Sequence, residues 1–270
     1  MMAEGMEPQT DPDAEIKAAE AAREIAAAKA VKDGVTMTVE DNRDKVIVVL
    51  SGGMDSVTLT YYMLSMNYAV IPVSFNYGQK HKKELLYAAM VCKDLGLEHR
   101  LIDLSSLTPH IATSALTSDQ AVPEGHYTAD NMKATVVPNR NMVMLSIAAA
   151  IGVAEGAVGI ATGIHAGDHA IYPDCRDGFR DSLEQTIRLG NEGFVSSTFA
   201  VLAPFVQIGK EEIADIGNGL GVDWTKTWSC YNGRAMHCGK CGTCVERIEA
   251  FDLAGLTDPT EYETTGLLAH

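Results

Sequence analysis

From Lys45 onward, short apolar runs rich in β-branched residues alternate with longer amphipathic segments, and this rhythm leaves few folds open to the 270-residue chain. The apolar runs predict strands over 46–50, 70–75, 99–104, 157–162 and 197–204. The amphipathic segments predict helices over 57–66, 82–95, 141–153, 178–189 and 210–220. Such alternation is typical of an α/β fold, in which helices cover both faces of a doubly wound parallel sheet of about five strands.

Three polar loops, 51–56, 76–81 and 163–177, directly follow predicted strands. In parallel sheets the carboxyl ends of the strands meet at one edge, where ligands bind. We therefore expect the three loops to converge on one mouth. Segment 105–137 contains Pro109 and Pro123 and shows no clear period, which predicts an irregular insertion.

The first of these loops reads Ser51-Gly-Gly-Met-Asp-Ser56 and joins the first predicted strand to its helix. The two glycines allow unusual backbone angles and close approach of a ligand, and the unpaired amides at a helix start attract anions. Asp55 would repel phosphate, so it either holds a divalent cation, for which we predict Mg²⁺, or caps the helix. A plain structural turn is the alternative. The predicted ATP-binding residues are Leu50, Ser51, Gly52, Gly53, Met54, Asp55, Ser56 and Val57.

Four cysteines, Cys230, Cys238, Cys241 and Cys244, lie within fifteen residues of one another. Cys-x-x-Cys steps on tight turns are typical of four-sulfur zinc sites, and a closed site of this kind is structural. A redox pair or free thiols is the alternative. His237 could replace one sulfur, although four cysteines suffice. Cys175 stands apart and is either a nucleophile or a buried structural thiol.

Polar residues crowd the remaining strand-end loops. Each alone is more often structural than catalytic, but together on one mouth they favour a substrate site. The substrate-binding candidates are Tyr77, Gln79, His81, Asp168, Tyr172, Asp174 and Arg176. Arg140 precedes a predicted helix and could reach an anion, and Lys210 is either a phosphate contact or a surface lysine. The catalytic candidates are Asp55, Ser56, Arg140 and Lys210.

The net charge of −15 is unevenly distributed. Residues 1–44 carry eleven acidic and five basic residues and predict a solvated tail or a loosely docked helix. The acidity argues against a protein that binds nucleic acid through its phosphates.

We see no secretory signal, and Glu155 interrupts the most apolar stretch, so we expect a soluble, cytoplasmic protein without a membrane span. The expected divisions are a tail (1–44), a catalytic domain (45–222) and a zinc-binding subdomain (223–270).

Several strings, in this order, resemble the 7-cyano-7-deazaguanine synthase family. The matching strings are LSGGMDS (50–56), FNYGQKH (75–81) with Glu84-Leu85, VPNRN (137–141), YPDCR (172–176), TWSCY (227–231) and CGKCGTC (238–244) with Arg247. The resemblance covers about 45–255. The first 44 residues have no counterpart in it, and the first cysteine gap is about one residue shorter than usual.

The resemblance implies a PP-loop fold of the adenine nucleotide alpha-hydrolase type and a two-stage use of ATP. The carboxylate of 7-carboxy-7-deazaguanine is adenylated, ammonia displaces AMP to give the amide, and a second ATP activates the amide for conversion to the nitrile. Mg²⁺ and positive side chains are required around the leaving pyrophosphate. Either Asp168 or Asp174 could accept hydrogen bonds from the guanine-like edge. A homodimer is expected by the same resemblance.

Two rival interpretations stay open. One is another PP-loop adenylating enzyme, either a glutamine-fed amidating ligase or a tRNA-thiolating enzyme. The chain has no room for a glutaminase domain, and a basic tRNA-binding face is not evident. The other is a non-enzymatic zinc-ribbon module that retains nucleotide binding. These two interpretations can be separated from a 7-cyano-7-deazaguanine synthase by testing whether the deazapurine acid and ammonium cause the release of AMP.

Overall fold

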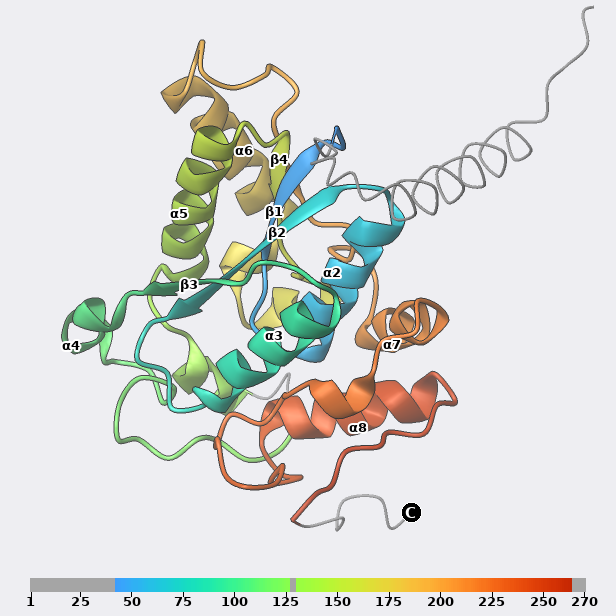
Figure 1. Cartoon of the computed structure of the whole chain (residues 1–270). Helices are drawn as coiled ribbons and strands as arrows, with labels where there is room; N and C mark the ends of the chain where they lie inside the picture. The colour runs from blue at the N-terminus through green and yellow to red at the C-terminus, as the bar shows by residue number, and fades with distance from the viewer. Residues whose placement is uncertain (1–41, 127–129, 264–270) are drawn as a thin grey trace, which may run out of the picture. The chain divides into compact units, whose positions relative to one another are not determined.

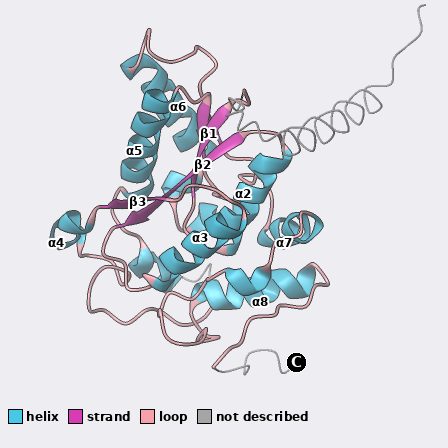
Figure 2. Cartoon of the chain, viewed as in Figure 1, coloured by secondary structure: helices cyan, strands magenta, loops and turns pink. Residues whose placement is uncertain are grey.

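The computed structural model describes residues 42–126 and 130–263, and from Arg43 onward they form one compact unit. The predicted tail, 1–44, lies almost entirely outside the described residues. At the centre of the unit is a five-stranded parallel sheet with the order β3-β2-β1-β4-β5 (Figures 1 and 2). The predicted α/β class and parallel sheet are therefore confirmed.

The strands follow the apolar runs, and the helices follow the amphipathic segments. The strands are β1 (Lys45–Val49), β2 (Ala69–Asn76), β3 (Arg100–Asp103), β4 (Gly159–Ala161) and β5 (Ala200–Leu202). The longer helices are α2 (Met54–Ser65), α3 (Lys83–Asp94), α5 (Arg140–Glu155), α6 (Asp177–Gly190), α7 (Lys210–Gly219) and α8 (Gly242–Leu253). Strand β5 is shorter than predicted because only three residues pair with β4.

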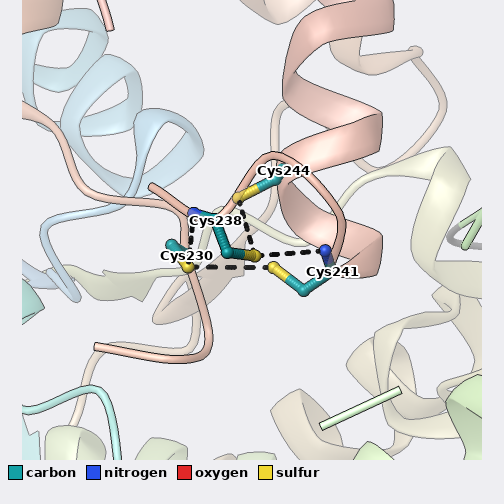
Figure 3. Close-up of side chains that lie close together, drawn as sticks. All are labelled: Cys230, Cys238, Cys241 and Cys244. Carbon is teal, nitrogen blue, oxygen red and sulfur yellow. Dashed lines mark hydrogen bonds between the residues drawn. The ribbon is translucent and has the colours of Figure 1, made fainter. Parts of the chain in front are cut away.

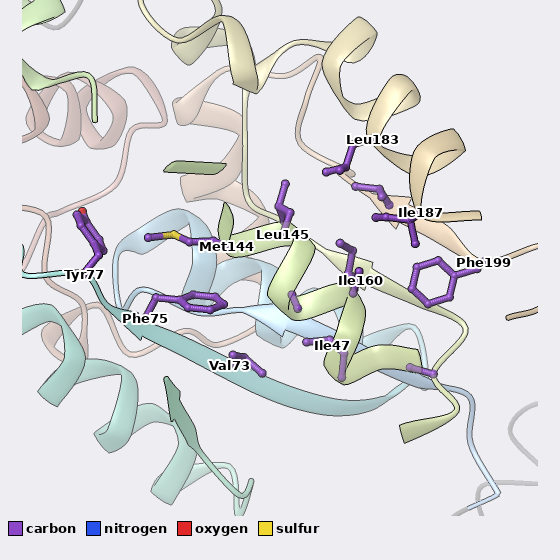
Figure 4. Close-up of a cluster of buried hydrophobic side chains, with 14 of the residues drawn as sticks. Ile47, Val73, Phe75, Tyr77, Met144, Leu145, Ile160, Leu183, Ile187 and Phe199 are labelled. Carbon is purple, nitrogen blue, oxygen red and sulfur yellow. The ribbon is translucent and has the colours of Figure 1, made fainter. Parts of the chain in front are cut away.

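Alternate residues of β1 face opposite layers, as the pleat of a strand requires. Ile47 packs with residues of α5 and α6, among them Leu145 and Leu183, in a cluster that fills one face (Figure 4). Val46 and Val48 pack with residues of α2 and α7 on the other face. In Figure 1, α5 and α6 accordingly lie across the sheet from α2, α3 and α7. Both faces of β1 are thus buried, which explains its continuous apolar sequence.

The order of the strands reverses at β1, which pairs with β2 on one side and β4 on the other. Ligands of open α/β sheets bind at such a reversal, beyond the carboxyl ends of the strands. The loops after β1 and β4 meet there. A Cβ on Gly163 would lie 3.3 Å from backbone atoms of Asp55 and Ser56, so a side chain there would push the two loops slightly apart.

The C-terminal region contains a helix that the sequence pattern did not predict. Helix α8 packs against α7, and its Phe251 joins Trp224 and residues of α2 and α3 in a buried cluster. Segment 105–137 is largely irregular, as predicted, but includes the short helix α4 (Thr108–Ile111) and 3₁₀ turns. Within the described ranges, no helix has the length and apolarity needed to cross a bilayer.

Candidate active site

A cavity of about 220 Å³ opens at the reversal point of the sheet. All three predicted loops contribute to it, and so does the C-terminal segment. The polar or aromatic residues on its wall include Ser51, Asp55, Ser56, Tyr77, His81, Glu84, Arg140, Asn141, His165, Asp168, Lys210, Trp228, Ser229 and Tyr231. The expected convergence of the loops is confirmed.

The loop after β1 keeps its shape through one glycine and one serine. Gly52 has φ +92°, and a Cβ there would collide with the carbonyl oxygen of Glu84 on α3. Gly53 has φ −75°, which any residue adopts, so the expectation of an unusual backbone holds for Gly52 alone. The Ser56 hydroxyl accepts hydrogen bonds from the amides of Ser51 and Gly52, at 3.1 and 3.3 Å. Ser51 is exposed, with its hydroxyl 3.0 Å from that of Ser56.

Asp55 and Lys210 meet at the start of two helices. The Lys210 ammonium lies 3.2 Å from a carboxylate oxygen of Asp55 and donates a 2.5 Å hydrogen bond to Glu246 of α8. Burial alone would lower the pKa of Lys210, but Asp55 and Glu246 raise it, so the side chain stays charged. Lys210 is only 9% exposed and is therefore not a surface lysine. The capping position of α2 belongs to Gly53, which removes the helix-capping role considered for Asp55.

The second carboxylate oxygen of Asp55 is buried and has no hydrogen-bond partner among the described residues. A buried carboxylate oxygen without a donor is costly unless a cation binds it. Asp55 therefore fits a divalent metal ion. His165 and Asp168, from the loop after β4, lie beside this site, with the His165 Nε2 atom 3.6 Å from Asp168 and 4.0 Å from Glu246. We call Asp55, His165, Asp168, Lys210 and Glu246 the Lys210 cluster.

Arg140 lies at the N-terminus of α5 among aromatic and sulfur-bearing side chains. Its guanidinium lies 5.9 Å from the ring centre of Tyr172 and close to Tyr77, Tyr231 and Cys175. Among the described residues, no carboxylate lies within 4.0 Å of it. Burial raises the pKa of Tyr77 to about 12, so this phenol stays neutral. We call Tyr77, Arg140, Tyr172, Cys175 and Tyr231 the Arg140 cluster.

Four substrate-binding candidates do not line the cavity. Gln79 is buried beneath it, and Tyr172 forms a 2.6 Å hydrogen bond with Thr135. Asp174 accepts a 3.3 Å hydrogen bond from the Asn141 amide, and Arg176 donates to the carbonyl of His169 at the exposed surface. Their contacts are with the scaffold around the site. Tyr77, His81 and Asp168 do reach the cavity.

Cys175 lies on the cavity wall, with 2% of its surface exposed. Burial, reinforced by Asp168 and Asp174, raises its pKa far above the usual range of a thiol. Asn141 donates a 3.3 Å hydrogen bond to its sulfur. A nucleophilic cysteine requires a thiolate, so these surroundings support the structural alternative for Cys175.

The four clustered cysteines bring their sulfur atoms within 4.8 Å of one another (Figure 3). The Cys238–Cys244 and Cys230–Cys241 sulfur separations are 3.9 and 4.0 Å. A tetrahedron with zinc–sulfur bonds of about 2.3 Å has edges of about 3.8 Å, so the spacing fits that ion. The Cys238 sulfur also accepts hydrogen bonds from the amides of Lys240 and Cys241, which favour a charged thiolate. The predicted grouping of these cysteines is confirmed.

The surroundings of the cysteines connect them to the cavity. His237 accepts a hydrogen bond from the Ser229 amide and stacks on Trp228, so it supports the loop without joining the sulfurs. The Trp228 amide donates a 2.9 Å hydrogen bond to the carbonyl of Gly52. The described part of the expected zinc-binding subdomain (223–270) lies in the same compact unit as the sheet and supplies part of the cavity wall.

Two helical carboxylates escaped selection from the sequence. Glu246 follows the last cysteine and reaches Lys210, while Glu84 of α3 faces the cavity. The sequence did carry a signal for Glu84, because it lies three residues after the polar string 75–81. For Glu246 the only signal was its position two residues after Cys244.

Sequence comparisons place the chain among known proteins. The family model described as queuosine biosynthesis protein QueC matches residues 45–255. The 7-cyano-7-deazaguanine synthase of Allorhizobium ampelinum is 49% identical over 219 residues, which cover 81% of this chain and 92% of the relative. The 7-cyano-7-deazaguanine synthase of Marinobacter nauticus is 49% identical over 220 residues, which cover 82% of this chain and 98% of that relative.

Among solved structures, the U34-tRNA thiolase NcsA from Methanococcus maripaludis aligns with a TM-score of 0.45 at 19% identity, covering 78% of this chain and 65% of that one. The family assignment rests instead on the sequence matches, which span nearly all of the described residues. They confirm the resemblance found from the motifs, and this chain belongs to the QueC family of enzymes, which acts in queuosine biosynthesis.

Proposed function

We propose that the protein is a 7-cyano-7-deazaguanine synthase, which converts 7-carboxy-7-deazaguanine and ammonia into the nitrile at the expense of ATP. The observation that carries this proposal is the positively charged Arg140, which has no carboxylate within 4.0 Å among the described residues, in a cavity that also contains the phosphate loop. A guanidinium in that situation fits an incoming carboxylate. The names of the curated relatives point to the same reaction.

The loop 51–56 and Lys210 would hold the ATP phosphates, because their amides and ammonium supply local positive charge. Asp55 would ligate Mg²⁺, which when bound helps neutralise the departing pyrophosphate. Arg140 would orient the substrate carboxylate toward the α-phosphorus. Of the two aspartates considered for the guanine-like edge, Asp168 lines the cavity and keeps that proposed role.

The four cysteines would hold a structural Zn²⁺, whose bound form fixes the loop 230–244. A closed set of four sulfurs offers no open position for a substrate, so Zn²⁺ is assigned no part in the chemistry. The homodimer, the cytoplasmic location and the absence of nucleic-acid and membrane partners remain predictions of the sequence.

The deciding experiment incubates the full-length protein with Mg-ATP, 7-carboxy-7-deazaguanine and ammonium, and measures AMP release and the product mass. We expect AMP together with a product whose mass is lower than that of the acid by the difference between a carboxylic acid and a nitrile. Omission of ammonium is the control and should abolish the nitrile. AMP release without a nitrile would favour another adenylating enzyme, and no AMP release would favour a nucleotide-binding module.

A further inference from the structure

Glu84 is a cavity-facing carboxyl whose position is fixed from both sides. It lies in the first turn of α3, and its side chain is 13% exposed. Gln79 donates a 3.2 Å hydrogen bond to one oxygen. The orientation of the Gln79 amide is itself set, because its oxygen accepts from the Tyr77 amide and its nitrogen donates to the carbonyl of Phe75. Among the described residues, the carboxyl is therefore held in one place without an ion pair to a lysine or arginine.

The Nε2 atom of His81 lies 3.3 Å from the other carboxylate oxygen of Glu84. Its second nitrogen, Nδ1, is buried and has no hydrogen-bond partner among the described residues. The imidazole can therefore adopt either tautomer without losing a contact. An ionised Glu84 can accept from Nε2–H, and a protonated Glu84 can donate to a bare Nε2. The pair thus tolerates both protonation states of the carboxyl.

Burial raises the pKa of Glu84 to about 8, against the opposing effects of Gln79 and Arg140. Burial also lowers the pKa of His81 to about 3, and Arg140 adds to this effect. The histidine therefore stays neutral while the carboxyl changes charge near neutral pH. The titratable groups that face this pair are Arg140, Tyr77 and Tyr231.

The chemistry of nitrile formation needs such a group. The nitrogen enters as ammonia with three hydrogens and leaves as a nitrile with none. Every one of those N–H bonds must break while the nitrogen is bound, so a base near the substrate has to accept protons repeatedly. A base works best when its pKa lies near the working pH. In the Lys210 cluster, by contrast, Asp55 and Glu246 lie within ion-pair distance of Lys210 and Asp168 lies beside His165.

We propose that Glu84 is the catalytic base that takes protons from the substrate nitrogen, with Gln79 and His81 as its positioning residues. This inference rests on the proposed function and adds a residue to it. When ammonia attacks the acyl-adenylate, the C–N bond forms, the C–O bond to AMP breaks, and one N–H proton passes to Glu84. The second ATP adenylates the amide oxygen with loss of pyrophosphate and of a second proton. Removal of the third proton forms the C≡N bond as AMP leaves.

The test compares Glu84→Gln with wild type in two assays. Adenylation is followed by pyrophosphate–ATP exchange with the deazapurine acid in the absence of ammonia, and the complete reaction is followed by nitrile formation. Glutamine keeps the size of the side chain and the hydrogen bond from Gln79 but cannot accept a proton. We expect adenylation within about 3-fold of wild type and nitrile formation about 10³-fold slower, a typical loss for a missing general base.

Three comparisons sharpen this test. Glu98→Gln, which changes an exposed carboxyl, should leave both rates unchanged. Glu84→Asp keeps a carboxyl and should restore nitrile formation to within about 10-fold of wild type, the shorter reach accounting for the remainder. The wild-type rate at saturating substrate should rise with pH and level off near the Glu84 pKa of about 8, whereas Glu84→Gln should lose this inflection.

The proposal is overturned if Glu84→Gln forms the nitrile at more than about a hundredth of the wild-type rate, because loss of a general base should slow the reaction at least about 10²-fold. It is also overturned if adenylation and nitrile formation fall by the same factor, because Glu84 would then bind the substrate or support the fold. A wild-type protein that adenylates the acid but forms no nitrile would instead refute the proposed function.

Discussion

The two clusters at the cavity, each with part of its residues on the wall, differ in how their cation is paired. In the Lys210 cluster, one ammonium lies within ion-pair distance of two carboxylates. In the Arg140 cluster, the cation is surrounded by phenols and a protonated thiol. In the first arrangement the ammonium is already paired before any ligand arrives, so it can exchange a carboxylate for a phosphate while a cation takes over the carboxylate. In the second, no carboxylate among the described residues lies within ion-pair distance of the guanidinium, which should bind an anion directly.

This difference predicts which ligand each cluster serves. When a lysine exchanges a carboxylate for a phosphate, the number of ion pairs stays the same, so the exchange costs little free energy. A guanidinium surrounded by aromatic rings gains most binding energy from one carboxylate that it holds with two hydrogen bonds. The ATP phosphates should therefore depend on Asp55 and Lys210 of the Lys210 cluster, and the carboxylate of the deazapurine acid on the Arg140 cluster. The following variants separate the two dependencies, in descending order of expected effect.

Lys210→Met should have the largest effect. It leaves Asp55 and Glu246 facing the phosphate site without a cation, so kcat/KM for ATP should fall about 10³-fold, or about 4 kcal/mol. Pyrophosphate release measures this loss. Lys93→Met on the exposed side of α3 is the matched control and should change nothing. An equal loss in both variants would contradict the role given to Lys210.

Cys238→Ser should lower the free energy of unfolding by about 3 kcal/mol through loss of the bound metal. Denaturant unfolding and the zinc content per chain measure the two effects. Because α8 carries both Cys244 and Glu246, the KM for ATP should rise more than the KM for the acid. Cys92→Ser, at a buried cysteine outside the cluster, should keep the zinc content. A full zinc content in Cys238→Ser would count against the four-sulfur site.

Arg140→Met should raise the KM for the deazapurine acid about 50-fold, equivalent to about 2.3 kcal/mol, because a charge-assisted contact is lost. The KM for ATP should stay within about 3-fold of wild type, since the side chain is not expected to touch the phosphates. Steady-state kinetics with each substrate varied in turn provides the measurement. Equal increases in both KM values would remove the distinction between the clusters.

Tyr172→Phe should have the smallest effect. Its hydroxyl is 2.6 Å from that of Thr135 in a buried site, and loss of this bond should cost about 1 kcal/mol of unfolding free energy. Because Tyr172 does not line the cavity, both KM values should stay within about 3-fold of wild type. The partner variant Thr135→Val, and the double variant with it, would show whether the loss belongs to this pair. A large increase in the KM for the acid would instead indicate that Tyr172 contacts the substrate.

Much of the fold follows from local pattern. Strand β1 and its neighbours are continuous apolar runs buried on both faces, and that periodicity is visible in the sequence. Helix α8 is different, because it begins with Gly242 and Thr243 and lacks a clear apolar stripe. Its formation depends on tertiary contacts, among them Phe251 against Trp224 and the buried Arg247, which no local pattern reveals.

The site was predictable where the chain itself brings residues together. The loop 51–56 and the cysteine cluster are local in sequence, and both were identified correctly as groups. Neighbours in a loop were harder to separate, because Tyr77 and Gln79 differ by two positions and only Tyr77 lines the cavity. Glu84 and Glu246 were not chosen as site candidates because a glutamate on a helix normally faces solvent, and what covers it depends on how distant segments pack.

The fully buried Arg247 has a consequence for how the chain is made. Its guanidinium binds both oxygens of Asp258 at 3.0 Å and also the Thr227 hydroxyl at 2.7 Å. Until Asp258 arrives, docking α8 would bury a charge without its counter-ion, which costs several kcal/mol. Helix α8 should therefore dock only after residue 258 has left the ribosome, and Glu246 and the sulfur of Cys244 reach their places with it. During synthesis the sheet can form first, and the cavity acquires its last wall in one late step.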